Sequence, residues 1–445
     1  MSRTAKWLII CASVAALCAA GVLTLRLHRQ KPAVQEQNQL KLLKDVIAII
    51  KMNYVEEVDT KKLLTGAIEG MLASLDPHSA FLTPEPYKEM RISMSGSFGG
   101  LGIEINIRDD KLTVISPIED TPAFRAGIKA NDHIWKIGDK LTKGMTITQA
   151  VNLMRGPKGT RVTLTILREG QKSPLVFPLV RDIINTKSLK ARSLEPGYGY
   201  IRIIQFQERT GQDFLKTLQL LRQENGGTLK GLVLDLRNNP GGLVDTATQV
   251  VDPFIGEGKS DGTIVSMRGR TPGSQRNYYA HIGTKEPSYP IVVLINGASA
   301  SASEIIAGAL QDQKRAIIMG TQSYGKGSVQ SVITLRDGYG LKLTTARYYT
   351  PSGRSIQAKG IRPDIIVAQT DVANKKNGMA PSPHDAAFGN RSSAPAALKS
   401  PLPPSPMVGD LANDFQLSRA LETLKGLNIF AGVTIKPATG AGGGK

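Results

Sequence analysis

Cysteine is almost absent from this chain of 445 residues: it occurs twice, as Cys11 and Cys18 near the N-terminus. The remainder of the chain therefore has no disulfide framework, no thiolate metal site and no cysteine nucleophile. Histidine is scarce as well, with five copies whose positions do not form the spacing of a metal-binding motif. We expect neither a metal ion nor a cofactor.

Aromatic residues make up only 5% of the chain. A surface on which the bases of single-stranded nucleic acid stack is therefore not expected. The formal net charge of +19 would favour a nucleic-acid partner, but Lys and Arg are spread along the whole chain rather than gathered on one helix or tail. We interpret the charge as favouring solubility and attraction to anionic membrane surfaces, and we expect no nucleic-acid partner.

An uncharged apolar run extends from Trp7 to Leu25 and is preceded by Arg3 and Lys6. It has no polar face, so a buried soluble helix is a poor interpretation. The run is long for a signal-peptide core and short for a typical membrane span, so an uncleaved anchor and a cleaved signal peptide both remain open. We assign residues 1–31 to a signal or anchor segment that meets the membrane. We expect an exported protein in the periplasm or on the extracytoplasmic face of the inner membrane.

Apolar residues recur at helical spacing over residues 34–75, which predicts an N-terminal helical region that we bound at 34–95. A loop at residues 76–79, Asp-Pro-His-Ser, contains the residue types of a catalytic triad. Side chains this close in the sequence rarely converge on one reacting atom. We therefore interpret the loop as a turn and helix cap.

Short strands and glycine loops replace the helical spacing at residues 96–183. A glycine-rich stretch at 97–102 runs into an alternating strand, and Pro-Ala-Phe-Arg-Ala-Gly-Ile follows at 122–128. This order resembles a PDZ domain, a module that binds peptide tails.

The PDZ-like segment predicts a binding role. Adjacent N–H groups at Leu101, Gly102 and Ile103 can form a nest for a peptide carboxylate. The strand edge beyond them can accept the peptide as an extra strand. The alternative is a loop that only turns the chain. We expect this segment to capture polypeptide substrates by their C-terminal tails.

Residues 184–368 show an α/β pattern. Continuous apolar strands are expected at 231–236 and 291–295, as occurs when helices cover both faces of a parallel sheet. Residues 369–408 are rich in Pro, Ser, Ala and Asn, which predicts a flexible linker. Helical spacing returns in a C-terminal helix at 409–430. The expected fold class is α/β multidomain.

Three polar motifs follow predicted strands of this region: Arg-Asn-Asn-Pro-Gly-Gly at 237–242, Ser-Ala-Ser-Ala-Ser-Glu at 299–304 and Gly-Lys-Gly-Ser-Val-Gln at 325–330. Open α/β sheets bind ligands at the carboxyl ends of their strands. With the PDZ-like segment in place, the order of motifs resembles the carboxy-terminal processing peptidases, also called tail-specific serine proteases. The resemblance covers residues 36–368 and implies a crotonase-like α/β peptidase core.

The resemblance implies roles for four side chains, namely nucleophile, general base, lysine-orienting residue and supporting acid, at Ser301, Lys326, Gln330 and Asp312 respectively. These residue types suit the chemistry. A serine hydroxyl is a poor nucleophile without a nearby base, and lysine can be that base where burial lowers its pKa.

The resemblance also implies an oxyanion hole built from backbone N–H groups near Gly242 and at Ala302. Glycine lets the backbone approach a developing oxyanion with no side chain in the way. A helix that begins just after Ser301 would add its positive end.

Simpler interpretations compete with these roles. Ser301 and Glu304 fit a capping box, so the serines could merely start a helix. Ser299 and Ser303 are rival nucleophiles on chemical grounds. An inactive, membrane-anchored PDZ scaffold is the corresponding non-enzymatic hypothesis.

Residues 320–326 match a Walker A loop as far as Lys326, but Gly327 stands where Ser or Thr should bind magnesium. The next residues predict a strand rather than a helix, so a nucleotide-binding P-loop is disfavoured. Acyl-CoA chemistry on a crotonase-like core lacks support for a nucleotide site in this sequence and does not explain the PDZ-like segment. Arg237 and Asn238 are interpreted as turn-forming, structural residues.

The expected function is therefore a serine endopeptidase that cleaves exported proteins through an acyl-enzyme, after the PDZ-like domain has bound their C-terminal tail. Whether the chain forms a homo-oligomer stays open at this stage.

Overall fold

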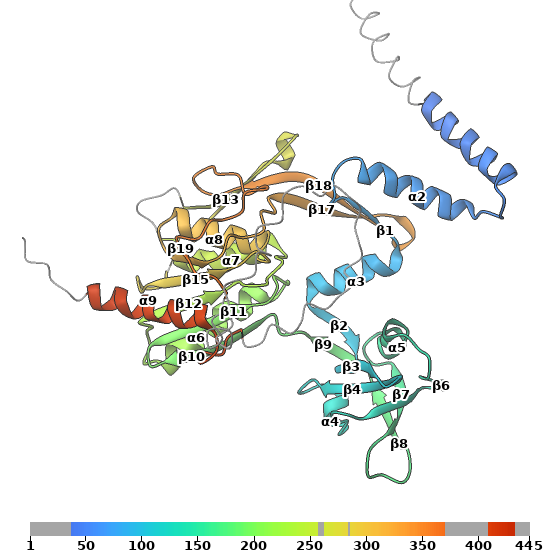
Figure 1. Cartoon of the computed structure of the whole chain (residues 1–445), viewed down its shortest axis with the longest axis horizontal. Coiled ribbons are helices and arrows are strands. Elements are labelled where there is room, and N and C mark those ends of the chain that lie inside the picture. The colour runs from blue at the N-terminus through green and yellow to red at the C-terminus, as the bar shows by residue number, and fades with distance from the viewer. Residues whose placement is uncertain (1–36, 257–261, 284, 370–407, 432–445) are drawn as a thin grey trace, which may run out of the picture. The chain divides into compact units, whose positions relative to one another are not determined.

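The computed structural model describes residues 37–256, 262–283, 285–369 and 408–431 (Figure 1). The predicted signal or anchor segment at 1–31 lies outside the described residues, and so does the predicted linker apart from its two end residues. Within the described ranges, no helix combines the length and the apolar character needed to cross a membrane. The chain divides into two units, Met1–Phe81 and Leu82–Lys445.

The first unit is helical in its described part. One helix covers residues 37–53, and α2 covers Thr60–Ala73. After α2, the carboxylate of Asp76 accepts the backbone N–H groups of His78 and Ser79 at 2.7 and 2.8 Å. Residues 76–79 therefore form a turn, and the predicted helical N-terminal region is confirmed.

The second unit begins at the end of β1 (Ala80–Leu82) and continues into α3 (Pro84–Ser95). Gly96 ends this helix with a φ of 67°, a conformation that glycine adopts without strain. The next strand, β2 (Ser97–Gly100), pairs antiparallel with β9 (Asp182–Asn185). The PDZ-like segment therefore starts and ends at one two-stranded ribbon.

The PDZ-like segment is an antiparallel sheet in the order β3-β4-β5-β7-β8, with β6 beside β5. Its strands are β3 (Ile103–Arg108), β4 (Lys111–Pro117), β5 (His133–Ile137), β6 (Lys140–Leu141), β7 (Arg161–Leu167) and β8 (Leu175–Val180). Two short helices, α4 (Pro122–Arg125) and α5 (Ile147–Met154), close a core that contains Val114, Ile134 and Leu164. β3 lies at the edge of this sheet, as tail capture requires.

The main sheet of the unit has the order β10-β11-β12-β15-β16-β19. The strands are β10 (Leu189–Glu195), β11 (Tyr198–Ile203), β12 (Gly231–Asp235), β15 (Ile291–Ile295), β16 (Ile317–Gly320) and β19 (Ile365–Ile366). β10 pairs antiparallel with β11, and the remaining neighbours are parallel.

Helices cover both faces of this sheet (Figure 1). On one face lie α6 (Thr210–Glu224), α7 (Val244–Val251) and α8 (Ala302–Asp312), and on the other lies α9 (Phe415–Ala431). Side chains alternate along a strand, so Leu234 packs in the core of α6 to α8 while Val233 packs with Leu417 of α9. Both faces are buried, which explains the continuous apolar strands. The predicted α/β multidomain fold is confirmed.

A second antiparallel group of strands lies beside the main sheet, in the order β17-β18-β13-β14. Its strands are β13 (Thr263–Gly269), β14 (Arg276–Tyr279), β17 (Ser328–Thr334) and β18 (Gly340–Tyr349). Three single 3-10 turns are η1 (Asp252–Phe254), η2 (Pro272–Ser274) and η3 (Arg336–Gly338). β17 begins directly after the loop that contains Lys326, and strand rather than helix follows that loop, as predicted.

Candidate active site

The three polar motifs meet at one edge of the main sheet. β12, β15 and β16 are neighbouring parallel strands, so their carboxyl ends lie side by side. The motif at 237–242 follows β12, the motif at 299–304 follows β15, and the loop to Lys326 follows β16. The topology therefore brings together segments that are far apart in the sequence.

The turn after β12 is held by asparagine side chains. Asn238 and Asn296 bond each other: the N–H of Asn238 donates to the Asn296 amide oxygen at 3.0 Å, and the Asn296 amide donates back at 2.8 Å. Asn239 is fully buried, and its amide bonds the carbonyl of Ile203 at 2.9 Å and the N–H of Gly241 at 2.9 Å. Three of these four hydrogen bonds tie the turn to Ile203 and to the segment after β15, and the fourth lies within the turn.

Ser301 is the N-cap of α8 and has backbone angles φ 56° and ψ −112°. A non-glycine residue in this region is strained, and such strain clusters at functional sites. The rival serines are occupied: Ser299 donates to the carbonyl of Leu236 at 2.8 Å, and Ser303 donates to the carbonyl of Asn239 at 3.0 Å. Both are fully buried, whereas Ser301 keeps 8% of its surface exposed. Exposure therefore favours Ser301 over the other two serines as the side chain that a substrate can reach.

Two backbone N–H groups near Ser301 are candidates for the oxyanion hole, as the resemblance implied. The N–H groups of Gly242 and Ala302 make no hydrogen bond within the described part of the chain. Gly241 lies directly against them, because a Cβ atom at this position would stand 2.8 Å from the Cβ of Ser301 and 3.0 Å from the nitrogen of Ala302. Sequence reasoning named Gly242 and missed Gly241, whose φ is +100°.

Glu304 joins the serine loop to the lysine loop. Its fully buried carboxylate accepts the N–H groups of Ser301 at 2.8 Å and Lys326 at 2.9 Å through the same oxygen. The other oxygen accepts the hydroxyl of Ser323 and the N–H of Gly325, each at 2.6 Å. Burial raises the pKa of Glu304, and these hydrogen bonds oppose the rise. The capping-box pattern signalled this glutamate in the sequence, but not its contacts with the lysine loop.

Lys326 has the electrostatic environment of a base. Burial lowers the pKa of its amine below the usual 10.5, and the positive charge of Lys342 lowers it further, while Glu304 opposes the shift. A neutral amine can accept a proton from a serine hydroxyl. The direction of this pKa shift could not be obtained from the sequence.

The structure separates the other two predicted side chains from this centre to different degrees. Gln330 lies on β17 and donates to the hydroxyls of Ser328 at 2.8 Å and Thr344 at 3.4 Å, without a bond to Lys326 among the described residues. Asp312 ends α8, at the opposite end of the helix from Ser301. There it accepts hydrogen bonds from Arg354 at 2.7 Å and from the N–H of Ser352 at 3.0 Å. The structure does not bring Asp312 to the nucleophile.

Tyr348 of β18 was not anticipated from the sequence. Burial raises the pKa of its hydroxyl, and hydrogen bonding with the nearby side chain of Ser301 opposes that rise. Its backbone N–H donates to the carbonyl of Gly327 at 2.7 Å, next to the lysine. The second group of strands therefore contributes a phenol beside the candidate nucleophile.

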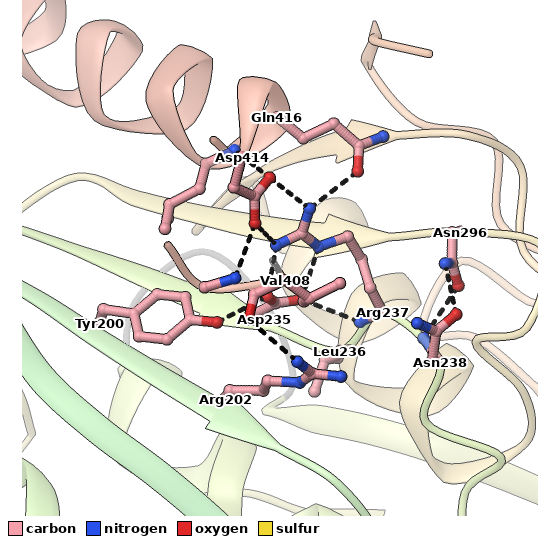
Figure 2. A network of polar contacts seen from close by, with 12 residues as sticks. Tyr200, Arg202, Asp235, Leu236, Arg237, Asn238, Asn296, Val408, Asp414 and Gln416 are labelled. Carbon is pink, nitrogen blue, oxygen red and sulfur yellow. Dashed lines mark hydrogen bonds and ion pairs between the residues drawn. The ribbon is translucent and has the colours of Figure 1, made fainter. Parts of the chain in front are cut away.

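Arg237 is more than a turn former. Only 1% of the Arg237 side chain is exposed. Its guanidinium lies between the carboxylates of Asp235 and Asp414 (Figure 2). Burial alone would lower the pKa of this arginine, but the two carboxylates raise it above its usual range. The same guanidinium holds the pKa of Asp414 below its usual value against the opposing effect of burial. No pattern in the sequence indicated this long-range contact.

The glycine loop of the PDZ-like segment contains the three residues predicted to bind a peptide carboxylate. Gly102 has a φ of +76°, and a Cβ at this position would lie 2.3 Å from the side chain of Thr121. The N–H groups of Leu101 and Gly102 make no hydrogen bond among the described residues. Ile103 begins the edge strand β3. The three predicted peptide-binding residues thus lead into an open sheet edge, beside α5.

Comparison with protein-family models assigns residues 197–367 to peptidase family S41. Residues 99–176 match the PDZ domain model, and residues 20–85 match the model described as the activating protease CtpB N-terminal domain.

Individual relatives agree with these assignments. A carboxy-terminal-processing protease of Bartonella bacilliformis is 50% identical over 338 residues, which are 75% of this chain and 77% of the relative. The carboxy-terminal processing protease CtpB of Bacillus subtilis is 37% identical over 73% of this chain and 66% of its own. Among solved structures, a photosystem II D1 C-terminal processing protease is 31% identical, with a TM-score of 0.42, over 71% of this chain and 84% of that one.

Proposed function

Because this chain belongs to the carboxy-terminal processing proteases of peptidase family S41 and is a serine-type peptidase with a PDZ domain, we propose that Ser301 is its nucleophile and Lys326 its general base. The proposal rests on the carboxylate of Glu304, because one of its two oxygens accepts hydrogen bonds from the backbone N–H groups of both Ser301 and Lys326. The lowered pKa of Lys326 supports it independently.

In the proposed reaction the amine of Lys326 takes the proton of the Ser301 hydroxyl as the serine oxygen attacks the scissile carbonyl. The N–H groups of Gly242 and Ala302 stabilise the oxyanion that develops. The ammonium of Lys326 then returns the proton to the leaving amine, which leaves an acyl-enzyme ester on Ser301. Water, deprotonated by the same lysine, hydrolyses the ester. Gln330 orients the lysine, which requires its amide to turn from Ser328 toward the amine.

We further propose that the PDZ domain binds the C-terminal tail of the substrate. The nest at Leu101, Gly102 and Ile103 holds the terminal carboxylate, and the tail pairs with the edge of β3. Capture at the terminus would deliver the segment upstream of it to Ser301.

The test compares wild-type protein with Ser301→Ala and Lys326→Ala, using an unfolded polypeptide that ends in apolar residues. Circular dichroism checks that all three proteins fold alike. We expect cleavage by the wild type alone, and a slower reaction when the substrate terminus is amidated. Cleavage by either variant at the wild-type rate would show that the dyad is misassigned. Inactivity of the wild type as well would favour the scaffold hypothesis.

The location of the protein is part of the proposal. We propose that residues 1–31 direct export and either remain as a membrane anchor or are removed, so that the peptidase acts on exported proteins. Cell fractionation and the intact mass of the purified protein distinguish the two fates. Recovery of the uncleaved chain from the cytoplasm would contradict export.

A further inference from the structure

One buried arginine, Arg237, links the start of the C-terminal helix α9 to the catalytic edge of the sheet. We propose that Asp414 and Gln416, at the start of α9, are positioning residues: acting through Arg237, they hold the turn at residues 238–242, the oxyanion turn, in its reactive geometry. The proposal rests on the proposed function, since it assigns a role in forming the oxyanion hole.

The first observation is that every N–H group of the Arg237 guanidinium is bonded (Figure 2). Asp235 receives two bonds, at 2.9 and 2.7 Å. Asp414 receives two more, at 2.8 and 2.6 Å, and the amide oxygen of Gln416 receives the fifth at 2.9 Å. A planar guanidinium bound on both sides has one orientation only.

The second observation is that α9 supplies most of these partners. Three of the five bonds go to residues 177 and 179 positions away in the sequence. Asp414 is itself fixed, because its carboxylate accepts the N–H groups of Gly409 at 2.8 Å and Leu417 at 3.1 Å. Gln416 donates to the carbonyl of Val367 at 2.7 Å. The anchor of Arg237 is therefore rigid on its α9 side.

The third observation is charge. Two buried carboxylates face one guanidinium, and the excess negative charge is stabilised by the hydroxyl of Tyr200, which donates to Asp235 at 2.8 Å, and by the N-terminal end of α9 beside Asp414. Removing one partner of a buried ion pair leaves an uncompensated charge, which drives the remaining groups to rearrange. Arg237 would move if Asp414 lost its charge.

Movement at Arg237 is transmitted to the site by the chain itself. Asn238 follows it with a φ of 58°, and the oxyanion turn then reaches Gly242 within four residues. The carbonyl of Asn239 accepts the N–H of Ala300 at 3.0 Å, next to Ser301. The turn is short and bonded along its length, so its residues are expected to move together. A shift of Arg237 at its start then displaces the N–H of Gly242 relative to Ser301.

The decisive experiment measures kcat and KM of the full-length protein for the unfolded polypeptide substrate. Asp414→Asn keeps the size of the side chain and removes its charge. We expect kcat to fall about 10- to 100-fold, because small misplacements of catalytic groups have effects of this size, with KM changed less than about twofold. Asp414→Glu should restore part of the loss. Gln416→Met, which removes one of the five bonds, should give a smaller fall in kcat and guards against misfolding of the charged variant.

Leu424→Ala is the matched control. Leu424 is fully buried on the same helix and packs against Gly231, away from the arginine. It should lower the melting temperature at least as much as Asp414→Asn while leaving kcat nearly unchanged. The proposal would be overturned if Asp414→Asn and Gln416→Met both kept the wild-type kcat. It would also be overturned if Leu424→Ala lost kcat in proportion to its loss of stability. Ser301→Ala is measured in parallel. If Ser301→Ala still cleaves the substrate, the proposed function and the positioning role both fail. If Ser301→Ala is inactive, the kcat of Asp414→Asn tests the positioning role alone.

Discussion

Lys326 is a buried lysine with one cationic and one anionic neighbour, and its lowered pKa determines how the peptidase should respond to pH. Burial and Lys342 lower the pKa of its amine from 10.5. As the proposed base, Lys326 must be neutral, so activity is expected to rise as pH rises through this lowered pKa and to be lost as pH falls below it. The same burial lowers stability at neutral pH. This loss of stability becomes smaller as pH rises from the lowered pKa toward 10.5, because between these two values the unfolded chain binds more protons than the folded one.

Lys342→Gln tests the cause of the shift. Without the neighbouring positive charge the pKa of Lys326 should rise, and the acidic limb of the kcat/KM profile should move to higher pH by roughly 0.3 to 1 unit. The control is Lys314→Gln, which removes an exposed charge at the far end of α8. Profiles that move equally in both variants would mean that net charge, rather than this contact, sets the pKa.

At the scale of elements, the site depends on how closely the oxyanion turn approaches α8. Gly241→Ala would bring a Cβ to 2.8 Å from the Cβ of Ser301 in a backbone conformation with a φ of +100°. We expect at least about a 100-fold loss of kcat, the size of effect that follows misplacement of catalytic groups. The measurement is a single-turnover rate together with a melting curve.

Gly227→Ala is the control for backbone strain. Gly227 has a similar φ of +94° but no atom within 4 Å of the added Cβ. It should lose stability without losing activity. Equal losses of activity in the two variants would show that strain, and not the contact with Ser301, explains the effect.

The buried cluster around Arg237 also affects the stability of the whole molecule. The pKa of Asp414 is lowered from 3.8, so its contribution to stability is complete at neutral pH and is lost as pH falls from 3.8 through the lower folded-state value. Asp414→Asn should therefore melt well below the wild type at pH 6, and this difference should shrink as pH falls toward 2.5. Melting curves across that range measure it. A difference that is constant with pH would indicate lost packing rather than lost charge.

The features that could be predicted for this protein are those that depend on local sequence patterns. Continuous apolar segments indicated strands buried on both faces, and β12 and β15 are such strands. The glycine loop and its downstream motif indicated the PDZ domain, which the family model confirms at residues 99–176. The order of the three polar motifs indicated the family resemblance, and that resemblance, rather than residue type alone, selected Ser301 and Lys326 as candidates.

Only the tertiary structure revealed the contacts between segments that are far apart in the sequence. Glu304 looked like a helix cap, yet it also binds the backbone of Lys326, 22 residues away. Arg237 looked like a turn residue, yet three of its five side-chain hydrogen bonds go to Asp414 and Gln416 at the start of α9. Asp312 was assigned through the family resemblance, and the structure places it at the end of α8 opposite Ser301. The local sequence determines which residues can form strands and turns, whereas pKa values and fixed orientations arise from buried neighbours that folding alone brings together.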